Sequence, residues 1–256
     1  MGLDSSKRDL LMKHYSQLCE TFSGLGLNEN EDGRFTIAGN LGFTVTHDGK
    51  TVEDDYDIEI IVPTDYPDNH PTVKETGNRI PRDKDNHVYP TNGTLCLGAP
   101  LAVKRTFAKQ RNLLWFVKEQ VVPFLFSHSY KQEYGVMPFG ELRHGSEGIL
   151  DYYKELFSVK DDWIVLGLLK ILADDNYKGH TLCPCGSNQK LRHCHGDLLR
   201  DVKEYQNKDS YLAEYVGIFK LLNKQGKKQS LTEYMPNSVL KSVRKHKRKL
   251  NLKKRK

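Results

Sequence analysis

Two of the five cysteines, Cys19 and Cys96, lie outside a C-terminal cysteine cluster. Cys19 borders the apolar side of a predicted helix, so we expect it in the core. Cys96 follows the turn-forming pair Asn92-Gly93, which predicts a short hairpin with the sulfur exposed on an irregular surface strand. A thiolate attacks well and leaves well, so Cys96 could take up an acyl group as a thioester and pass it to an amine. The alternative is an unreactive buried thiol, since free cysteine is among the most buried residue types.

Two histidines and two aspartates are candidates to assist Cys96. His87 precedes Cys96 on the same segment, and His144 lies in a later loop. Imidazole titrates near neutral pH, so either ring could adjust the thiolate or relay the proton of an incoming amine. Asp83 and Asp85, on the loop of His87, could orient that amine. A structural role is open for both histidines, and His87 could hold its loop through a side-chain hydrogen bond.

The segments before Cys96 predict a helix followed by a sheet. Residues 5–22 repeat apolar side chains at helical spacing. Residues 34–63 alternate apolar and other side chains, with turn residues at 39–40 and 47–49, and predict a three-stranded antiparallel meander. Residues 66–90 contain four prolines and predict a mostly irregular loop, which is usually functional when it is this long.

The segments after Cys96 are predicted to be helical. Residues 112–134 have a helical repeat that Pro123 must kink or interrupt. A loop that carries His144 follows at residues 135–148. Further helices are predicted at residues 149–157, 161–173 and 198–225, the last with Gly226 as its stop.

The order of these features resembles the core of ubiquitin-conjugating enzymes. In that family a helix, a meander, a Tyr-Pro…Pro turn (here residues 66–71), a histidine loop and an Asn-Gly-x-x-Cys-Leu segment precede a crossover helix. The resemblance covers about residues 5–134. It is closer to the prokaryotic branch, where a loop like HGSEGI (residues 144–149) follows and a SecA-type zinc motif can be appended. It implies an α+β, ubiquitin-conjugating-type fold in which Cys96 carries the C-terminus of a partner protein.

The sequence departs from that family at one position. Family members usually have an asparagine two residues after the loop histidine, thought to stabilise the oxyanion formed when a lysine attacks. Tyr89 occupies that place here, and the distance from His87 to Cys96 is one residue short. Either Asn92, His87 or a backbone N–H supplies the hydrogen bond, or the transfer to the amine runs differently. Tyr89 could instead simply pack on the hairpin.

The segment CPCGSNQKLRHCHG (residues 183–196) resembles the zinc motif found at the C-terminus of SecA, called SEC-C. Three thiolates and one imidazole complete a tetrahedral Zn²⁺ site without a position for water, so the zinc is expected to be structural. The expected ligands are Cys183, Cys185, Cys194 and His195, with His193 as the alternative fourth. So small a unit has little core, so the metal should hold it folded.

The basic charge of the chain is a property of its end. Residues 241–256 hold ten of the 39 Lys and Arg residues and no acid, so the other 29 basic residues face 33 acids, a net charge of about −4. We expect a solvated flexible tail, with an acidic partner or nucleic acid as the alternatives. The odd cysteine number, the lack of a secretory signal and a longest apolar stretch of about ten residues predict a cytoplasmic protein without a membrane span.

The expected function is that of a conjugating-type transferase. No G-x-G-x-x-G loop is present, so a separate activating enzyme or an activated donor is implied. The prokaryotic resemblance implies an anti-phage, CBASS-like setting, with a cyclic GMP-AMP synthase-like nucleotidyltransferase as the partner whose C-terminal glycine is carried. Two rivals share the fold: a non-catalytic protein-binding module, and a hydrolase that uses Cys96 and His144. The expected divisions are a catalytic domain (1–175), the zinc module (176–200), a helical extension (201–240) and the basic tail (241–256).

Overall fold

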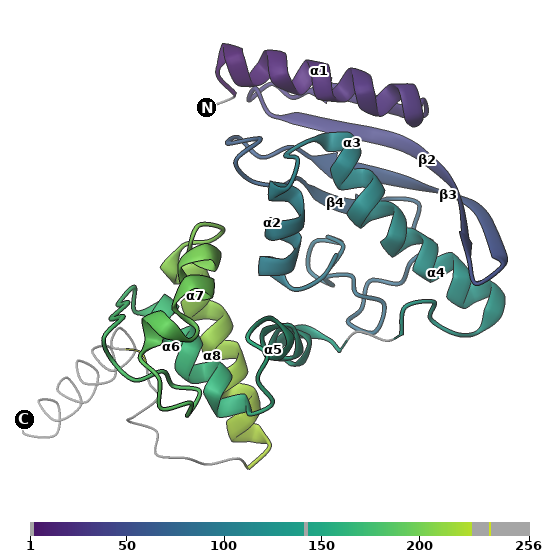
Figure 1. Cartoon of the computed structure of the whole chain (residues 1–256). Coiled ribbons are helices and arrows are strands. Elements are labelled where there is room, and N and C mark those ends of the chain that lie inside the picture. Colours follow the sequence, from purple (N-terminus) through teal and green to yellow (C-terminus); the bar gives the residue numbers. More distant parts are fainter. Residues whose placement is uncertain (1–2, 141–142, 227–235, 237–256) are drawn as a thin grey trace, which may run out of the picture. The chain divides into compact units, whose positions relative to one another are not determined.

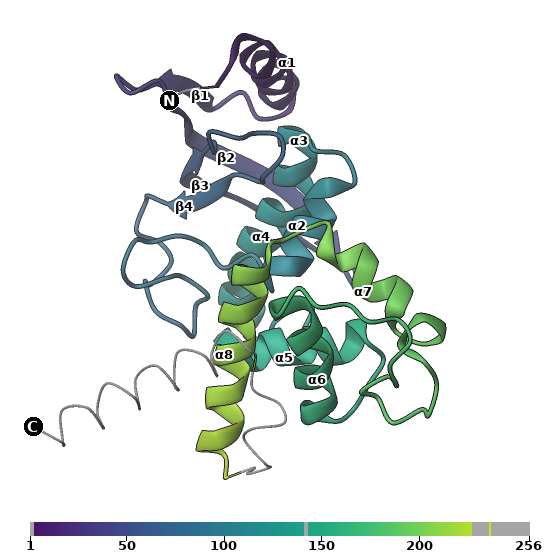
Figure 2. The same cartoon turned by 90° about the vertical axis from the view of Figure 1, so that its left-hand side faces the viewer.

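The chain forms two compact units, Met1–His144 and Gly145–Lys256, which are described separately (Figures 1 and 2). The structure is a computed structural model that describes residues 3–140, 143–226 and 236. The expected basic tail, residues 241–256, lies outside the described residues, as do residues 227–235 and 237–240 of the expected helical extension. The described part is mixed α+β, as predicted, while the finer ubiquitin-conjugating type stays a prediction.

The first unit is built on a four-stranded antiparallel sheet with the strand order β1-β2-β3-β4. Asp4 caps the helix that precedes it, because its carboxylate accepts a hydrogen bond from the Lys7 N–H at 2.9 Å. The elements are α1 (Ser5–Thr21), β1 (Leu25–Glu29), β2 (Phe35–His47), β3 (Lys50–Ile61) and β4 (Thr72–Glu75).

The predicted three-stranded meander is wrong in its strands: residues 34–63 form two strands, β2 and β3, and the sequence did not predict β1 and β4. The predicted turn at residues 39–40 is wrong, because β2 continues through Gly39, which pairs with Leu25 on β1 and with Ile58 on β3. Gly39 has a φ of 141°, and a Cβ there would lie 2.1 Å from the Gly24 carbonyl oxygen. The glycine therefore serves a close strand approach instead of a turn. The predicted turn at residues 47–49 is confirmed between β2 and β3.

A helical run follows the Cys96 segment and crosses the face of β2 and β3 (Figure 1). The predicted interruption at Pro123 is confirmed as a π-helical turn that ends just before this proline. Asn112 caps the start of the run by accepting a hydrogen bond from the Trp115 N–H at 3.2 Å. The run consists of α3 (Leu113–Phe116), η1 (Val117–Val121) and α4 (Val122–Tyr134), and the sequence did not predict the short α2 (Pro100–Ala108) before it.

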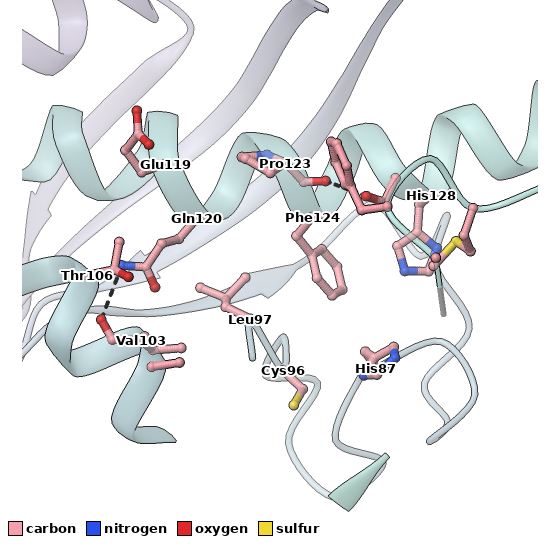
Figure 3. Close-up of a pocket in the computed structure, with 15 residues that line it drawn as sticks. His87, Cys96, Leu97, Val103, Thr106, Glu119, Gln120, Pro123, Phe124 and His128 are labelled. Carbon is pink, nitrogen blue, oxygen red and sulfur yellow. Dashed lines mark hydrogen bonds between the residues drawn. The ribbon is translucent and has the colours of Figure 1, made fainter. Parts of the chain in front are cut away.

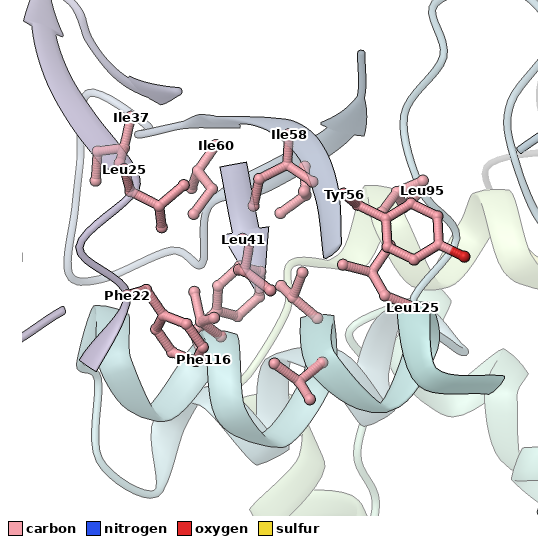
Figure 4. Packing of buried hydrophobic residues seen from close by; sticks show 14 of the residues in the cluster. Phe22, Leu25, Ile37, Leu41, Tyr56, Ile58, Ile60, Leu95, Phe116 and Leu125 are labelled. Carbon is pink, nitrogen blue, oxygen red and sulfur yellow. The ribbon is translucent and has the colours of Figure 1, made fainter. Parts of the chain in front are cut away.

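The core of the first unit lies between the sheet and these helices (Figure 4). Leu41 and Ile58 from the strands and Phe116 and Leu125 from the helices are fully buried. Burial of a large apolar side chain contributes about 1.5–3 kcal/mol, so this layer fixes the helical run against the sheet.

The second unit is helical and contains the cysteine cluster. Its predicted helix over residues 198–225 is in fact two helices, because Asn207 starts a new one by accepting a hydrogen bond from the Ser210 N–H at 2.9 Å. The elements are α5 (Gly145–Leu156), α6 (Asp162–Ala173), the 3₁₀ turn η2 (Leu191–His193), α7 (Gly196–Lys203) and α8 (Lys208–Lys224).

The two units divide the chain differently from the domains expected from the sequence. Helices α5 and α6, expected within a domain of residues 1–175, both pack against α8 in the second unit. The predicted four-part division itself stays a prediction. Over the described residues, no helix has both the length and the apolar character that a membrane crossing requires.

Candidate functional site

Cys96 lies at the end of a short hairpin, as the sequence predicts. Val88 pairs with Leu95, and the Cys96 N–H donates to the His87 carbonyl at 2.7 Å. The tight turn contains Gly93, whose φ of 72° suits a residue without a Cβ. Asn92 stabilises this turn, because its Oδ1 accepts a hydrogen bond from the Thr94 N–H at 3.0 Å. The hairpin places the sulfur just beyond the last cross-strand hydrogen bond.

The Cys96 side chain is half-buried and lines two hollows of the first unit. The larger is a cavity of about 270 Å³ between the Cys96 segment, α2 and the helical run, and His87 also lines it (Figure 3). The smaller, of about 150 Å³, is also lined by His70 and Tyr89. Cys96 is therefore not sealed in the core.

The structure brings His87 and His144 together. Their ring centroids are 4.1 Å apart at an angle of 45°. His87 has a φ of 54°, an uncommon conformation for a residue with a Cβ, and its carbonyl accepts the Cys96 N–H. His87 lines the larger cavity with Cys96, whereas His144 is not among the residues of its wall. His87 is thus the better placed of the two to exchange a proton at that cavity.

His128 also lines the larger cavity, and the sequence analysis missed it. Its Nε2 lies 3.1 Å from the Asn86 carbonyl oxygen. Burial lowers its pKa, the nearby His87 lowers it further, and the Asn86 contact opposes both effects. A neutral ring is therefore favoured at neutral pH. The sequence feature that could have indicated His128 is its position four residues after Phe124, because this spacing places both side chains on one face of α4.

Tyr89 and Cys96 both line the smaller hollow, and Tyr89 is 51 % exposed. The Cys96 sulfur itself has a long contact of 3.9 Å with the Gly98 carbonyl oxygen. Burial raises the pKa of Tyr89, and the charge of Cys96 raises it further. A phenol that remains protonated can donate to a thiolate or to an oxygen beside it. Tyr89 is therefore a neighbour of Cys96 in this hollow.

The other candidates are held away from the sulfur. Asp85 is exposed and lines neither hollow. Asp83 instead accepts hydrogen bonds from the backbone and side chain of Asn86, and these lower the pKa of its carboxyl. Asn92 is exposed, and its carboxamide oxygen is engaged in the turn. None of the three lines the Cys96 cavity.

The predicted zinc ligands form one cluster in the second unit. One ligand atom from each of Cys183, Cys185, Cys194 and His195 lies within 4.8 Å of the others. The closest separations are 3.2 Å from His195 Nδ1 to the sulfurs of Cys183 and Cys194. His193 is excluded as the fourth ligand of this cluster because its exposed ring accepts a hydrogen bond from Arg192.

Contacts around the cluster prepare it for a metal ion. His195 Nε2 lies 2.9 Å from the Phe157 carbonyl oxygen, and donation there leaves Nδ1 facing the sulfurs. A Cβ on Gly167 of α6 would lie 2.9 Å from Pro184, so this glycine allows the cysteine hairpin to pack closely on the helix. Three sulfurs and one nitrogen suit Zn²⁺, which would link the hairpin to the turn before α7.

In the absence of a bound cation, two thiols of the cluster differ in pKa. Burial raises the pKa of Cys183 to about 12. Burial opposes ionisation of Cys185 too, but hydrogen bonds from Ser187 and the neighbouring sulfurs lower its pKa to about 6. A bound cation deprotonates coordinating thiols outright, so metal binding and proton release are coupled here.

These donors and their packing define a small structural metal-binding module. The family model of the SEC-C motif matches residues 181–197, the segment that contains all four ligands. Comparison with curated proteins and with solved structures gave no match, so neither supports the resemblance to ubiquitin-conjugating enzymes. The motif covers a small part of the chain and bears on the metal site alone.

Proposed function

We propose that Cys96 carries an acyl group as a thioester and transfers it to an amine, as ubiquitin-conjugating enzymes do. The observation that supports this most is the position of the sulfur. Cys96 is half-buried and lines a cavity with His87 and a smaller hollow with Tyr89. A merely structural thiol needs neither a cavity nor this set of polar neighbours.

In the loading step, the Cys96 thiolate attacks the carbonyl carbon of an activated C-terminus. A carbon–sulfur bond forms, and the leaving group departs with its bonding electron pair. The proton of the thiol passes to a base, for which His87 in the cavity wall is the candidate that the sequence also predicts. Tyr89, which lines the smaller hollow with Cys96, would donate a hydrogen bond to the thiolate.

In the transfer step, a neutral amine attacks the thioester carbonyl. The carbonyl oxygen becomes an oxyanion, and the sulfur leaves with the electron pair of the carbon–sulfur bond. Tyr89, which lines the smaller hollow with Cys96, would supply the hydrogen bond to the oxyanion in place of the missing asparagine. The amine loses its proton to His87 or to solvent.

The partners of this reaction follow from the resemblance. The donor is a protein with a C-terminal glycine, activated by a separate enzyme, and a cyclic GMP-AMP synthase-like nucleotidyltransferase in anti-phage defence fits the prokaryotic branch. The SEC-C module holds Zn²⁺ as a structural link, and its ligands take no part in the transfer.

The test uses an activated donor so that no unknown enzyme is needed. The protein is mixed with the 2-mercaptoethanesulfonate thioester of N-acetyl-Leu-Gly-Gly, and intact mass is measured before and after adding a thiol. We expect a thiol-sensitive adduct that Cys96→Ala abolishes. Cys19→Ala is the matched control, because Cys19 is another half-buried thiol outside the zinc cluster, and its loss should leave the adduct unchanged.

Addition of a primary amine then separates the rival functions. Release of the tripeptide as an amide supports a transferase. Release as the free acid at a rate independent of the amine indicates a hydrolase, and absence of any adduct on Cys96 indicates a binding module. Either of the last two results contradicts the proposal.

A further inference from the structure

His87 has a backbone conformation that its neighbours must hold in place. Its φ of 54° lies in the left-handed region, which costs free energy in a residue with a Cβ and persists where surrounding contacts fix it. The hairpin pairs Val88 with Leu95, so His87 lies opposite Cys96 one step further along. Opposite residues of an antiparallel pair share one face, and both side chains line the larger cavity. The conformation of His87 therefore decides where its imidazole lies relative to the sulfur.

Hydrogen bonds fix the peptide group on each side of His87. In the group after it, the His87 carbonyl accepts from the Cys96 N–H at 2.7 Å. The Val88 N–H, at the other end of that group, donates to the Asp83 carbonyl at 3.0 Å. In the group before it, the His87 N–H donates to the Lys84 carbonyl at 3.0 Å. Three of the four ends are therefore held by backbone groups of the same segment.

The fourth end is held by a side chain of α4. It is the Asn86 carbonyl, which lies 3.1 Å from Nε2 of His128. A carbonyl can only accept, so this nitrogen carries the proton. Burial lowers the pKa of His128, so its ring is neutral near pH 7 and Nε2 bears its one N–H. Since the two planar peptide groups set φ and ψ of His87 between them, His128 takes part in setting both angles.

Asp83 holds Asn86 from within the loop. Its carboxylate accepts from the Asn86 backbone N–H at 2.8 Å and from the Asn86 carboxamide at 2.9 and 3.0 Å. Asn86 is thus bound on one side by its own loop and on the other by His128, which links this loop to α4.

We infer that His128 is a positioning residue for His87: through the Asn86 carbonyl it fixes the left-handed turn that keeps the His87 imidazole in the Cys96 cavity, where that ring takes the thiol proton. The proton moves from sulfur to a ring nitrogen of His87, and the bonding electron pair stays on the sulfur. As a step of catalysis the inference rests on the proposed function, whereas ionisation of the thiol can be measured without it.

The test measures the reaction of Cys96 with iodoacetamide at pH 7, which requires a thiolate and no acyl transfer. The sulfur attacks the methylene carbon, iodide leaves with the electron pair of the carbon–iodine bond, and peptide mass spectrometry gives the rate at Cys96. We expect His87→Ala to slow the reaction about tenfold. His128→Leu should slow it about fivefold, because one hydrogen bond of the loop is lost. His128→Gln should retain most of the rate, because its Nε2 can donate to the same carbonyl.

Two further comparisons separate positioning from a general loss of structure. If His128 acts through His87, adding His128→Leu to His87→Ala should slow the reaction no further. Asp83→Ala removes the other support of Asn86 and should act like His128→Leu, which keeps the test valid if the buried His128→Leu variant fails to fold. Asp85→Ala is the matched control, because it removes the same charge from an exposed residue that lines neither hollow, and it should react at the wild-type rate. Thermal unfolding checks the fold of each variant.

Three results would overturn the inference. They are a wild-type rate in His87→Ala or His128→Leu, equal rates in His128→Gln and His128→Leu, and a double variant slowed by the product of the two single effects. If alkylation follows the expected pattern and the thioester probe still fails to acylate Cys96, the positioning of His87 is supported and the proposed function is contradicted.

Discussion

At the scale of the residue, Tyr89 is the side chain whose role changed most. The sequence offered packing or an altered mechanism for it, and the structure places it with Cys96 in the wall of the smaller hollow. Burial raises the pKa of Tyr89 first, and the charge of Cys96 raises it further.

The titration of Tyr89 tests this proximity. The charge of Cys96 raises the pKa of Tyr89, after burial, so Cys96→Ala should lower it while leaving it above the ordinary value of about 10. The pH dependence of the tyrosine ζ-carbon NMR signals measures this, with Tyr89→Phe providing the assignment.

A second cysteine and tyrosine pair supplies the control for this titration. A hydrogen bond with Cys19 is the main cause that raises the pKa of Tyr15. Cys19→Ala should therefore lower the pKa of Tyr15 and leave that of Tyr89 unchanged. An unaltered Tyr89 titration in Cys96→Ala would place its hydroxyl away from the sulfur.

At the scale of the element, the sequence predicted the long segments with a clear apolar repeat and missed short elements. The helical repeat at residues 5–22 and the hairpin before Cys96 are both observed. Strand β4, four residues long, and helix α2, nine residues long, are too short for a period to be recognised against flanking prolines.

The candidate site was predicted in part for a similar reason. Sequence spacing places Cys96 and His87 on one hairpin, because cross-strand neighbours follow from a tight turn. It cannot place His128 or Gln120 beside them, because these lie on the helical run and reach the cavity only through tertiary packing. Asp85 shares a loop with His87 but is exposed away from the cavity, since loop residues do not share one face.

A substitution at Gly39, where the sequence wrongly predicted a turn, tests the close approach of the strands. Gly39→Ala should destabilise the first unit by about 2–4 kcal/mol, because its Cβ would overlap the Gly24 carbonyl oxygen in a backbone conformation that alanine rarely adopts. Urea unfolding can be followed by fluorine NMR of 5-fluorotryptophan, since the chain has two tryptophans and Trp115 lies in the first unit.

Gly42→Ala is the control on the same strand. A Cβ at Gly42 would meet its nearest neighbour, the Asp55 Cβ, at 3.9 Å, which is ordinary contact. We expect a change within about 0.5 kcal/mol for this variant. Equal effects of the two substitutions would contradict the role given to Gly39.

At the scale of the whole molecule, the chain joins a unit that contains Cys96 to a unit with a cluster of metal-ligating side chains. The chemistry of the two sites differs in kind. A nucleophilic role for Cys96 requires an accessible sulfur that can form and break a covalent bond. A structural zinc site requires sulfurs that stay bound to the metal. Cys19, which the sequence predicted in the core, and Cys96 are both half-buried, and the other three cysteines belong to the cluster.

Removal of the metal should affect the second unit first. A ligand at a thousandfold excess over its Kd stabilises the folded state by about 4 kcal/mol, so a zinc chelator should lower the unfolding midpoint that Trp163 of α6 reports. His195→Ala should reduce the zinc content measured by mass spectrometry and cause the same loss. His193→Ala, which removes the adjacent imidazole outside the cluster, should retain the metal. Zinc lost equally from both variants would contradict the ligand set.

The π-helical turn Val117–Val121 has a consequence for how the cavity side of the helical run can evolve. Such a turn is equivalent to one surplus residue, and each residue advances an α-helix by about 100°. Deleting a single residue there would produce a more regular helix and at the same time swing everything downstream around the axis, carrying Phe124 and His128 off the wall they now form. Deletion of one residue at this turn would thus move several side chains of the cavity wall in a single mutation. A point substitution would change one of these side chains at a time.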